Sequence, residues 1–191
     1  MFGLFDFLKE NPDYIIGVFV LIATVLGMQF KNMKWIILCQ ILSNFLLGLQ
    51  CIIGGTLSTG GVVMLATVQT VLSFTLNYKK IPFPAWLTAS FMVGYSAITV
   101  IGFLSPSVAS SPFDLITMVA VWCFALSIVQ EKSWICRFFL ALNVSLWLIY
   151  DFAVLPSAAL NHIIIITSIL FSILRNDRAE WKAFLRHFLR K

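Results

Sequence analysis

The side chains best suited to recognising a ligand are amides placed inside long apolar segments. Asn44 and Asn143 lie near the middle of two such segments, and Gln69 lies within a third. An amide among apolar residues costs free energy unless it is paired, so it normally faces the interior of a helix bundle. Each amide therefore has two interpretations. It bonds a neighbouring helix, or it bonds a polar solute in a cavity between helices.

The sequence lacks the residue motifs of the common catalytic and metal-binding sites. Its four cysteines lie within or at the edges of apolar segments, without CxxC spacing or an adjacent histidine. That placement is typical of small apolar packing residues. The sequence also has no HExxH motif, no P-loop and no Ser/His/Asp constellation. We therefore expect no enzyme, no cofactor and no metal centre.

The composition places the amides in a membrane. The chain has 191 residues, of which 60% are hydrophobic and 11% charged, and its mean hydropathy is +0.96. A soluble domain is about half apolar and about a quarter charged. The composition therefore excludes a soluble enzyme, a nucleic-acid-binding domain and a disordered chain. It predicts an all-α membrane protein.

Seven apolar segments can be counted, each close to the length of about 20 residues that crosses a bilayer. Pro82 and Pro84 open the fourth segment, which runs to about residue 104. The other six segments are 14–30, 33–53, 60–78, 113–130, 134–152 and 157–175. The sequence therefore predicts seven transmembrane helices joined by short loops.

The positive charges predict the orientation of these helices. With seven spans, twelve of the thirteen Lys and Arg residues lie on one side and only Lys9 lies on the other. Because loops rich in Lys and Arg stay in the cytoplasm, the N-terminus is expected outside and the C-terminus in the cytoplasm.

Both ends of the chain have the pattern of segments that lie on a membrane surface. Residues 1–13 hold a short apolar cluster that fits an N-terminal interfacial segment. Residues 177–191 follow the spacing of an amphipathic helix with a basic face. Such a helix is expected on the anionic cytoplasmic leaflet, and a docking helix for a partner is the alternative.

An internal repeat relates the two halves of the chain. A shift of 99 residues superposes segments two and three on segments six and seven without a gap, and segment one falls on segment five under nearly the same shift. The matched pairs include Trp35 with Trp134, Asn44 with Asn143, Ser73 with Ser172, and Asn77 with Asn176. The predicted organisation is a first three-helix repeat at 14–80, a linker helix at 81–104 and a second three-helix repeat at 105–176. A single linker span makes the repeats parallel, with a site between them near mid-membrane.

The stretch from Trp147 to Asn161 resembles the PQ-loop/MtN3 superfamily of SWEET and SemiSWEET sugar transporters. Those proteins carry a similar Trp-x-x-Tyr run, then a proline and, five residues later, an asparagine, which match Trp147, Pro156 and Asn161. The resemblance implies that Trp147 and Asn161 line the substrate pocket. It also implies a SWEET-like 3+1+3 parallel repeat with the N-terminus outside.

The first half of the chain departs from that superfamily. Gly48 and Val62 stand where the repeat would place the tryptophan and the asparagine. Gln29 and Gln130 match the glutamines of the Pro-Gln signature, but neither follows a proline. In the sugar transporters those prolines act as hinges for alternating access, so the departure weighs against sugar transport by that mechanism.

A second resemblance is to the YgjV-like bacterial inner-membrane proteins, which are similar in length. Residues 44–48 read Asn-Phe-Leu-Leu-Gly and precede a glycine-rich turn, as in the first half of that family. This resemblance implies a multi-pass protein of the bacterial inner membrane. The Trp-x-x-x-Asp run from Trp147 to Asp151 is also similar to part of the Pnu-type vitamin transporters, which share the three-one-three plan.

Two functional hypotheses follow. The first is a small-molecule transporter or facilitator for a neutral polar solute, which is sugar-, nucleoside- or vitamin-like, through a cavity between the two repeats. The candidate substrate-binding residues are Asn44, Gln69, Asn143, Trp147 and Asn161. The alternative is a non-transporting membrane receptor, assembly factor or scaffold on the same fold. The expected partners are the solute and the lipid bilayer, with a homo-oligomer left open and nucleic acid excluded.

Overall fold

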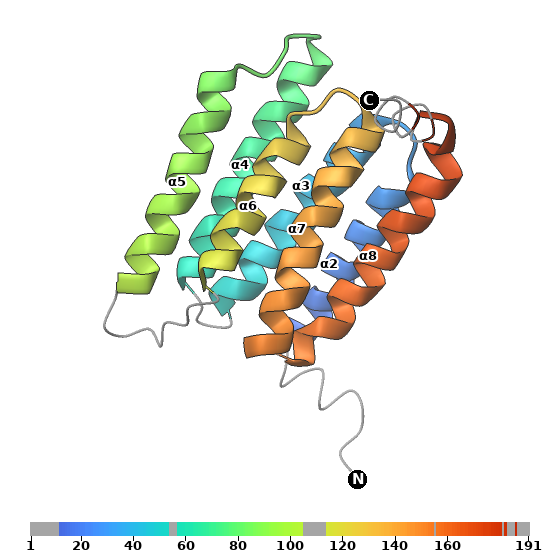
Figure 1. The fold of residues 1–191 in the computed structure, drawn as a ribbon. Coiled ribbons are helices and arrows are strands. Elements are labelled where there is room, and N and C mark those ends of the chain that lie inside the picture. Colours follow the sequence, from blue (N-terminus) through green and yellow to red (C-terminus); the bar gives the residue numbers. More distant parts are fainter. Residues whose placement is uncertain are drawn as a thin grey trace.

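A computed structural model of the chain describes residues 12–53, 57–104, 114–154 and 156–180, together with residues 182 and 186. The described part folds into helices that run up and down alongside one another (Figure 1). The helices are α2 (Pro12–Gln29), α3 (Met33–Ile53), α4 (Leu57–Tyr78), α5 (Ala85–Leu104), α6 (Asp114–Ile128), α7 (Ser133–Val154) and α8 (Pro156–Asn176). Each one coincides, within a few residues at either end, with one of the apolar segments expected from the sequence.

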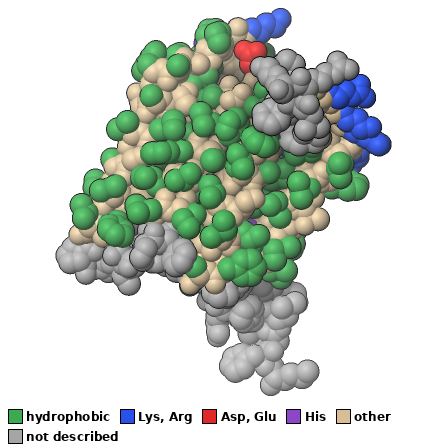
Figure 2. Space-filling model, in the orientation of Figure 1, with side chains coloured by type: hydrophobic (Ala, Val, Ile, Leu, Met, Phe, Trp, Pro, Cys, Tyr) green, Lys and Arg blue, Asp and Glu red, His purple; other side chains and the backbone are tan. Residues whose placement is uncertain are grey.

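Five of these helices are long and apolar enough to cross a membrane. They are α3, α5 and the ranges Gly60–Tyr78, Ser133–Tyr150 and Ala159–Asn176 within α4, α7 and α8. Over the described residues, α2 and α6 contain shorter apolar stretches, Ile15–Gln29 and Leu115–Ile128. Hydrophobic side chains cover the face drawn in Figure 2, and the charged side chains gather at one end of the bundle. Such a surface is suited to lipid, not to water.

We call that end the basic end. It holds the turns at residues 30–32, 79–84 and 129–132 and the last turn of α8. Asn32 caps α3 there, because its side-chain oxygen accepts from the Lys34 amide at 3.0 Å. After α4, the Lys80 amide bonds the Asn77 carbonyl and the Ile81 amide bonds the Leu76 carbonyl. This Schellman pattern places Lys80 in the left-handed region, at φ 57°.

Six of the helices close into a ring. Within each half, every helix packs on the next one along the chain, in the order α2–α3–α4 and α6–α7–α8. Between the halves, α2 packs on α8 and α4 packs on α6. The seventh helix, α5, lies outside the ring against α4 and α6, at the edge of the bundle in Figure 1. Each half therefore meets the other along two contacts.

The best-buried side chains concentrate toward the basic end. The large side chains that are less than 2% exposed include Met28 at the end of α2, Ile36 and Ile37 at the start of α3, and Ile128 at the end of α6. Within the described residues, every buried side-chain nitrogen or oxygen atom has a hydrogen-bond partner. Such pairing is required of a protein in lipid, where water cannot solvate polar groups.

The expected surface segments lie mostly outside the described residues. Of the N-terminal interfacial segment, only residues 12 and 13 are described, and they belong to α2. Of the amphipathic segment 177–191, residues 178–180, 182 and 186 are helical. Residues 54–56, 105–113 and 155 also lie outside the described part.

Candidate functional site

A buried ion pair joins the start of α7 to the end of α8 at the basic end. Arg137 and Asp177 are 0% and 2% exposed, and the guanidinium donates to one carboxylate oxygen. Ser133 Oγ donates to the other carboxylate oxygen at 3.0 Å. Arg137 also donates from Nε to the Met28 carbonyl at 3.2 Å and from Nη2 to the Phe30 carbonyl. The pair therefore satisfies carbonyls at the end of α2, which a helix terminus leaves without intrahelical partners.

The last turns of α8 complete this cap on α2. Ser172 Oγ donates to the Met28 carbonyl. Arg175 and Asn176 donate to the Gln29 carbonyl at 2.8 and 3.1 Å. The end of a first-half helix is thus held by two helices of the second half.

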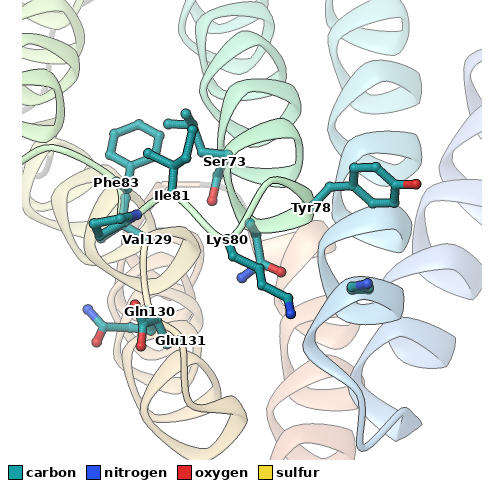
Figure 3. A pocket seen from close by; sticks show the side chains of 12 residues that line it. Ser73, Tyr78, Lys80, Ile81, Phe83, Val129, Gln130 and Glu131 are labelled. Carbon is teal, nitrogen blue, oxygen red and sulfur yellow. The ribbon is translucent and has the colours of Figure 1, made fainter.

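The equivalent contact in the other half lies between α4 and α6. Ser73, the repeat mate of Ser172, donates to the Ile128 carbonyl at 2.6 Å, in the last turn of α6. Beside this bond is a cavity of about 470 Å³ (Figure 3). Its polar lining comes from Lys34, Ser73, Asn77, Tyr78, Lys80, Gln130 and Glu131. Because this lining has two ammonium groups and one carboxylate, its net charge is positive.

The two repeat-related asparagines are buried in helix–helix contacts. Asn44 and Asn143 are each 9% exposed. Asn44 Nδ2 donates to Thr70 Oγ1 at 3.4 Å, and Asn143 Nδ2 donates to the Ala120 carbonyl at 2.7 Å. Each amide therefore bonds the adjacent helix of its own half, α4 for Asn44 and α6 for Asn143. Neither residue lines the cavity at the basic end.

Gln69 joins three helices. Its side chain is 0% exposed, accepts from the Tyr95 hydroxyl at 2.7 Å and donates to the Ala125 carbonyl at 3.1 Å. These bonds tie α4 to α5 and α6. A further bond at 3.0 Å, from the Trp122 indole to Ser96 Oγ, ties α6 to α5. The linker helix is therefore fixed to one helix from each half.

Trp147 and Asn161 lie toward the opposite end, near the corner between α7 and α8. The Trp147 ring stacks on His162 with ring centroids 6.2 Å apart and 12° between their planes. It also meets Tyr150 edge-on at 5.7 Å. Asn161, the neighbour of His162, is exposed. The structure thus brings Trp147 beside the first turns of α8, whereas Asn44, Gln69 and Asn143 occupy separate helix contacts.

The sequence reasoning missed the ion pair and the cavity at the basic end. In the sequence, Arg137 was counted only among the positive charges that predict the orientation. A signal was present, because Arg137 falls inside the apolar segment 134–152, and a charge within a span usually has a partner. No comparable signal predicts the cavity, which forms where α3, α4 and α6 meet.

Comparison with known proteins identifies the family. Residues 13–180 match the model of the Imp-YgjV family, which is described as a bacterial inner membrane protein. Searches of curated proteins and of solved structures gave no match. The match spans most of the chain, and the five helices able to cross a membrane agree with a multi-pass protein of the bacterial inner membrane. The chain therefore belongs to the Imp-YgjV family of bacterial inner membrane proteins.

Proposed function

We propose that the protein is a transporter or facilitator that moves a neutral polar solute across the inner membrane. The solute is sugar-, nucleoside- or vitamin-like and passes between two three-helix halves. In this proposal all seven helices span the membrane in a SWEET-like plan. The helices α2–α4 and α6–α8 are the parallel repeats, α5 is the linker, and the basic end faces the cytoplasm.

The observation that carries the proposal is the equivalence of the two contacts between the halves. The first helix of each half packs on the third helix of the other, as α2 on α8 and as α6 on α4. A similar hydrogen bond occurs in both contacts, from Ser172 to the Met28 carbonyl and from its repeat mate Ser73 to the Ile128 carbonyl, and each acceptor lies in the last turn of its helix. A pseudo-two-fold axis parallel to the helices would produce this pattern. Halves related in this way can rock against each other around a central path.

The distribution of burial supports a state closed at the basic end. The best-buried large side chains, such as Ile37 and Ile128, lie toward that end. Toward the opposite end Trp147 is half-buried and Asn161 is exposed. In this proposal Trp147 and Asn161 contact a solute that arrives from that end, because an aromatic ring and an amide can stack and hydrogen-bond without charge.

The buried ion pair favours the alternative function. Arg137 holds the end of α2 to α7, so it ties the two halves together. Any rocking of the halves would break the bonds from Arg137 to the Met28 and Phe30 carbonyls and leave part of a buried charge without partners, which is costly. A non-transporting receptor, assembly factor or scaffold on the same fold has no such cost.

Uptake by the purified protein in liposomes separates these functions. We expect one class among labelled neutral sugars, nucleosides and vitamins to enter protein-containing liposomes faster than empty ones. Trp147→Ala should lower the initial rate about fivefold, because a lost ring contact is worth about 1 kcal/mol. Trp86→Ala is the matched control, because that ring is 69% exposed on α5 and should leave uptake unchanged.

Two results would count against transport. In the first, none of the classes enters. In the second, a solute raises the unfolding temperature of the protein but does not cross the membrane. The second result would establish the receptor alternative, since a ligand at 100 times its dissociation constant stabilises a protein by about 2.7 kcal/mol.

A further inference from the structure

We propose that the cavity at the basic end, between α3, α4 and α6, binds a phosphate group. The group is carried by an anionic lipid headgroup or by a soluble phosphorylated molecule. This inference does not depend on transport, because it rests on the cavity and on its repeat mate alone.

The cavity occupies the place that the ion pair occupies in the other half. Five residues at or beside the ion pair have repeat mates in the first half. The pairs are Ser133 with Lys34, Ser172 with Ser73, Arg175 with Leu76, Asn176 with Asn77, and Asp177 with Tyr78. All five of these mates line the cavity. The same structural position is therefore filled by an internal salt bridge in one half and forms a partly open pocket in the other.

The substitutions between the two halves exchange an internal anion for unpaired cations. In the second half, Asp177 supplies the carboxylate that meets Arg137 and Ser133. In the first half, Tyr78 stands in the place of Asp177, and Lys34 stands in the place of Ser133. The Lys34 ammonium lies 5.3 Å from the centre of the Tyr78 ring, which is a weaker partner than a carboxylate.

A second ammonium group enters from the turn after α4. The Lys80 side chain lies between Tyr78 on one side and Gln130 and Glu131 on the other (Figure 3). Within the described part of the chain the one ion pair is that of Arg137 with Asp177, so Glu131 pairs with neither cavity lysine. The cavity therefore presents two cations that lack an anionic partner among the described residues.

The backbone at Lys80 suits a glycine better than a lysine. At φ 57° this residue, which follows the last turn of α4, has the left-handed conformation that favours glycine. Replacing Lys80 by glycine therefore removes its ammonium group without straining the turn.

A phosphate group fits this lining better than a neutral ligand does. Its oxygens accept several charge-assisted hydrogen bonds, and the residues that line the cavity include two lysines, Lys34 and Lys80, and the amides Asn77 and Gln130. At about 470 Å³ the cavity is larger than a phosphate and within the range of ligand sites. The excess volume leaves room for the headgroup or solute that carries the phosphate.

Thermal unfolding of the protein in lipid nanodiscs tests the proposal in two arms. In one arm, discs of equal parts phosphatidylcholine and phosphatidylglycerol are compared with discs of phosphatidylcholine alone. In the other arm, pyrophosphate is titrated into protein in phosphatidylcholine discs. We expect the unfolding temperature to rise in one arm, and the rising arm identifies the source of the phosphate.

The variants Lys34→Gln and Lys80→Gly each remove one cavity ammonium. Each should reduce the affinity for the stabilising probe about tenfold, the usual effect of losing a charge-assisted bond. Lys80→Gly is expected to fold, because glycine suits this backbone position. Lys31→Gln removes the same charge from the exposed turn after α2, outside the cavity lining, and is the matched control.

The proposal is overturned if neither probe raises the unfolding temperature. It is also overturned if Lys31→Gln weakens the effect as much as the two cavity variants do, because the probe would then sense only the general positive charge of this end.

Discussion

At the scale of single residues, Arg137 shows how a charge can be held inside an apolar bundle. Its guanidinium reaches one carboxylate and two backbone carbonyls, so its main donors are satisfied without water. Burying a charge is costly, and the attraction of its partner mostly offsets that cost. The repeat mate of Arg137 is Leu38, which is 41% exposed. The same helix position can therefore be apolar when no carboxylate faces it.

Replacing one member of this pair should destabilise the protein strongly. Arg137→Leu leaves the Asp177 carboxylate buried and unpaired, and we expect the free energy of unfolding to fall by about 3–5 kcal/mol. The double variant Arg137→Leu with Asp177→Tyr copies the residues of the first half and removes both charges. Its free energy of unfolding should therefore fall by less than that of Arg137→Leu alone. Denaturant unfolding of the double variant and of both single variants, Arg137→Leu and Asp177→Tyr, measures the loss of unfolding free energy in each. A double variant that lost as much as the sum of the single variants would show that the pair is not energetically coupled.

At the scale of elements, the close contact of α2 with α3 depends on a glycine. A Cβ added at Gly27 would lie 2.7 Å from Cys39 Cβ. A β-carbon cannot rotate away from this clash as a side-chain tip can, so the two helices would have to separate. At Gly61, in contrast, an added Cβ would meet only Ile98 Cγ2, at 3.8 Å, which is an ordinary contact.

These two glycines predict opposite effects of the same substitution. Gly27→Ala should lower the free energy of unfolding by about 1–3 kcal/mol through overpacking. Gly61→Ala should leave it unchanged or raise it by up to about 1 kcal/mol, because alanine is the better helix former. Thermal unfolding in one detergent compares the pair directly. If the two variants lost the same free energy of unfolding, separation of α2 from α3 would not be the cause of the loss at Gly27.

At the scale of the whole molecule, the charge distribution bears on orientation. The described Lys and Arg residues at the basic end include Lys31, Lys79, Lys80, Lys132 and Arg175. From the positive-inside rule we expect such an end in the cytoplasm. In the proposed arrangement of seven spans, the N-terminal and C-terminal segments would lie on opposite sides of the membrane.

Reporter fusions should locate the C-terminal end on the cytoplasmic side. Green fluorescent protein fused after residue 191 is expected to fluoresce, because it matures in the cytoplasm, and alkaline phosphatase at the same site is expected to be inactive. The same reporters fused after Leu104, at the opposite end, should give the reverse result. An active phosphatase fused after residue 191 would contradict the proposed orientation.

The positions of the helices could be predicted closely from the sequence, because each span is a local property of the chain. Segment 33–53 coincides with α3, and Pro156 opens α8 as a proline in the first turn should. The asparagine pair was also recognisable, since a polar amide within an apolar segment must find a partner. Its two interpretations stayed open in the sequence, and the bonds of Asn44 to Thr70 and of Asn143 to Ala120 are of the helix-joining kind.

The sequence by itself determined the apolar segments, the accumulation of positive charge at one end and the repeat of 99 residues. These features depend on composition and spacing along the chain, which can be read without knowing which helices touch. Only the tertiary structure decided that Arg137 meets Asp177 while their mates Leu38 and Tyr78 leave the other contact hollow. Charge pairing and cavity volume depend on distances between side chains far apart in the sequence. A repeat pattern relates equivalent positions but does not determine those distances.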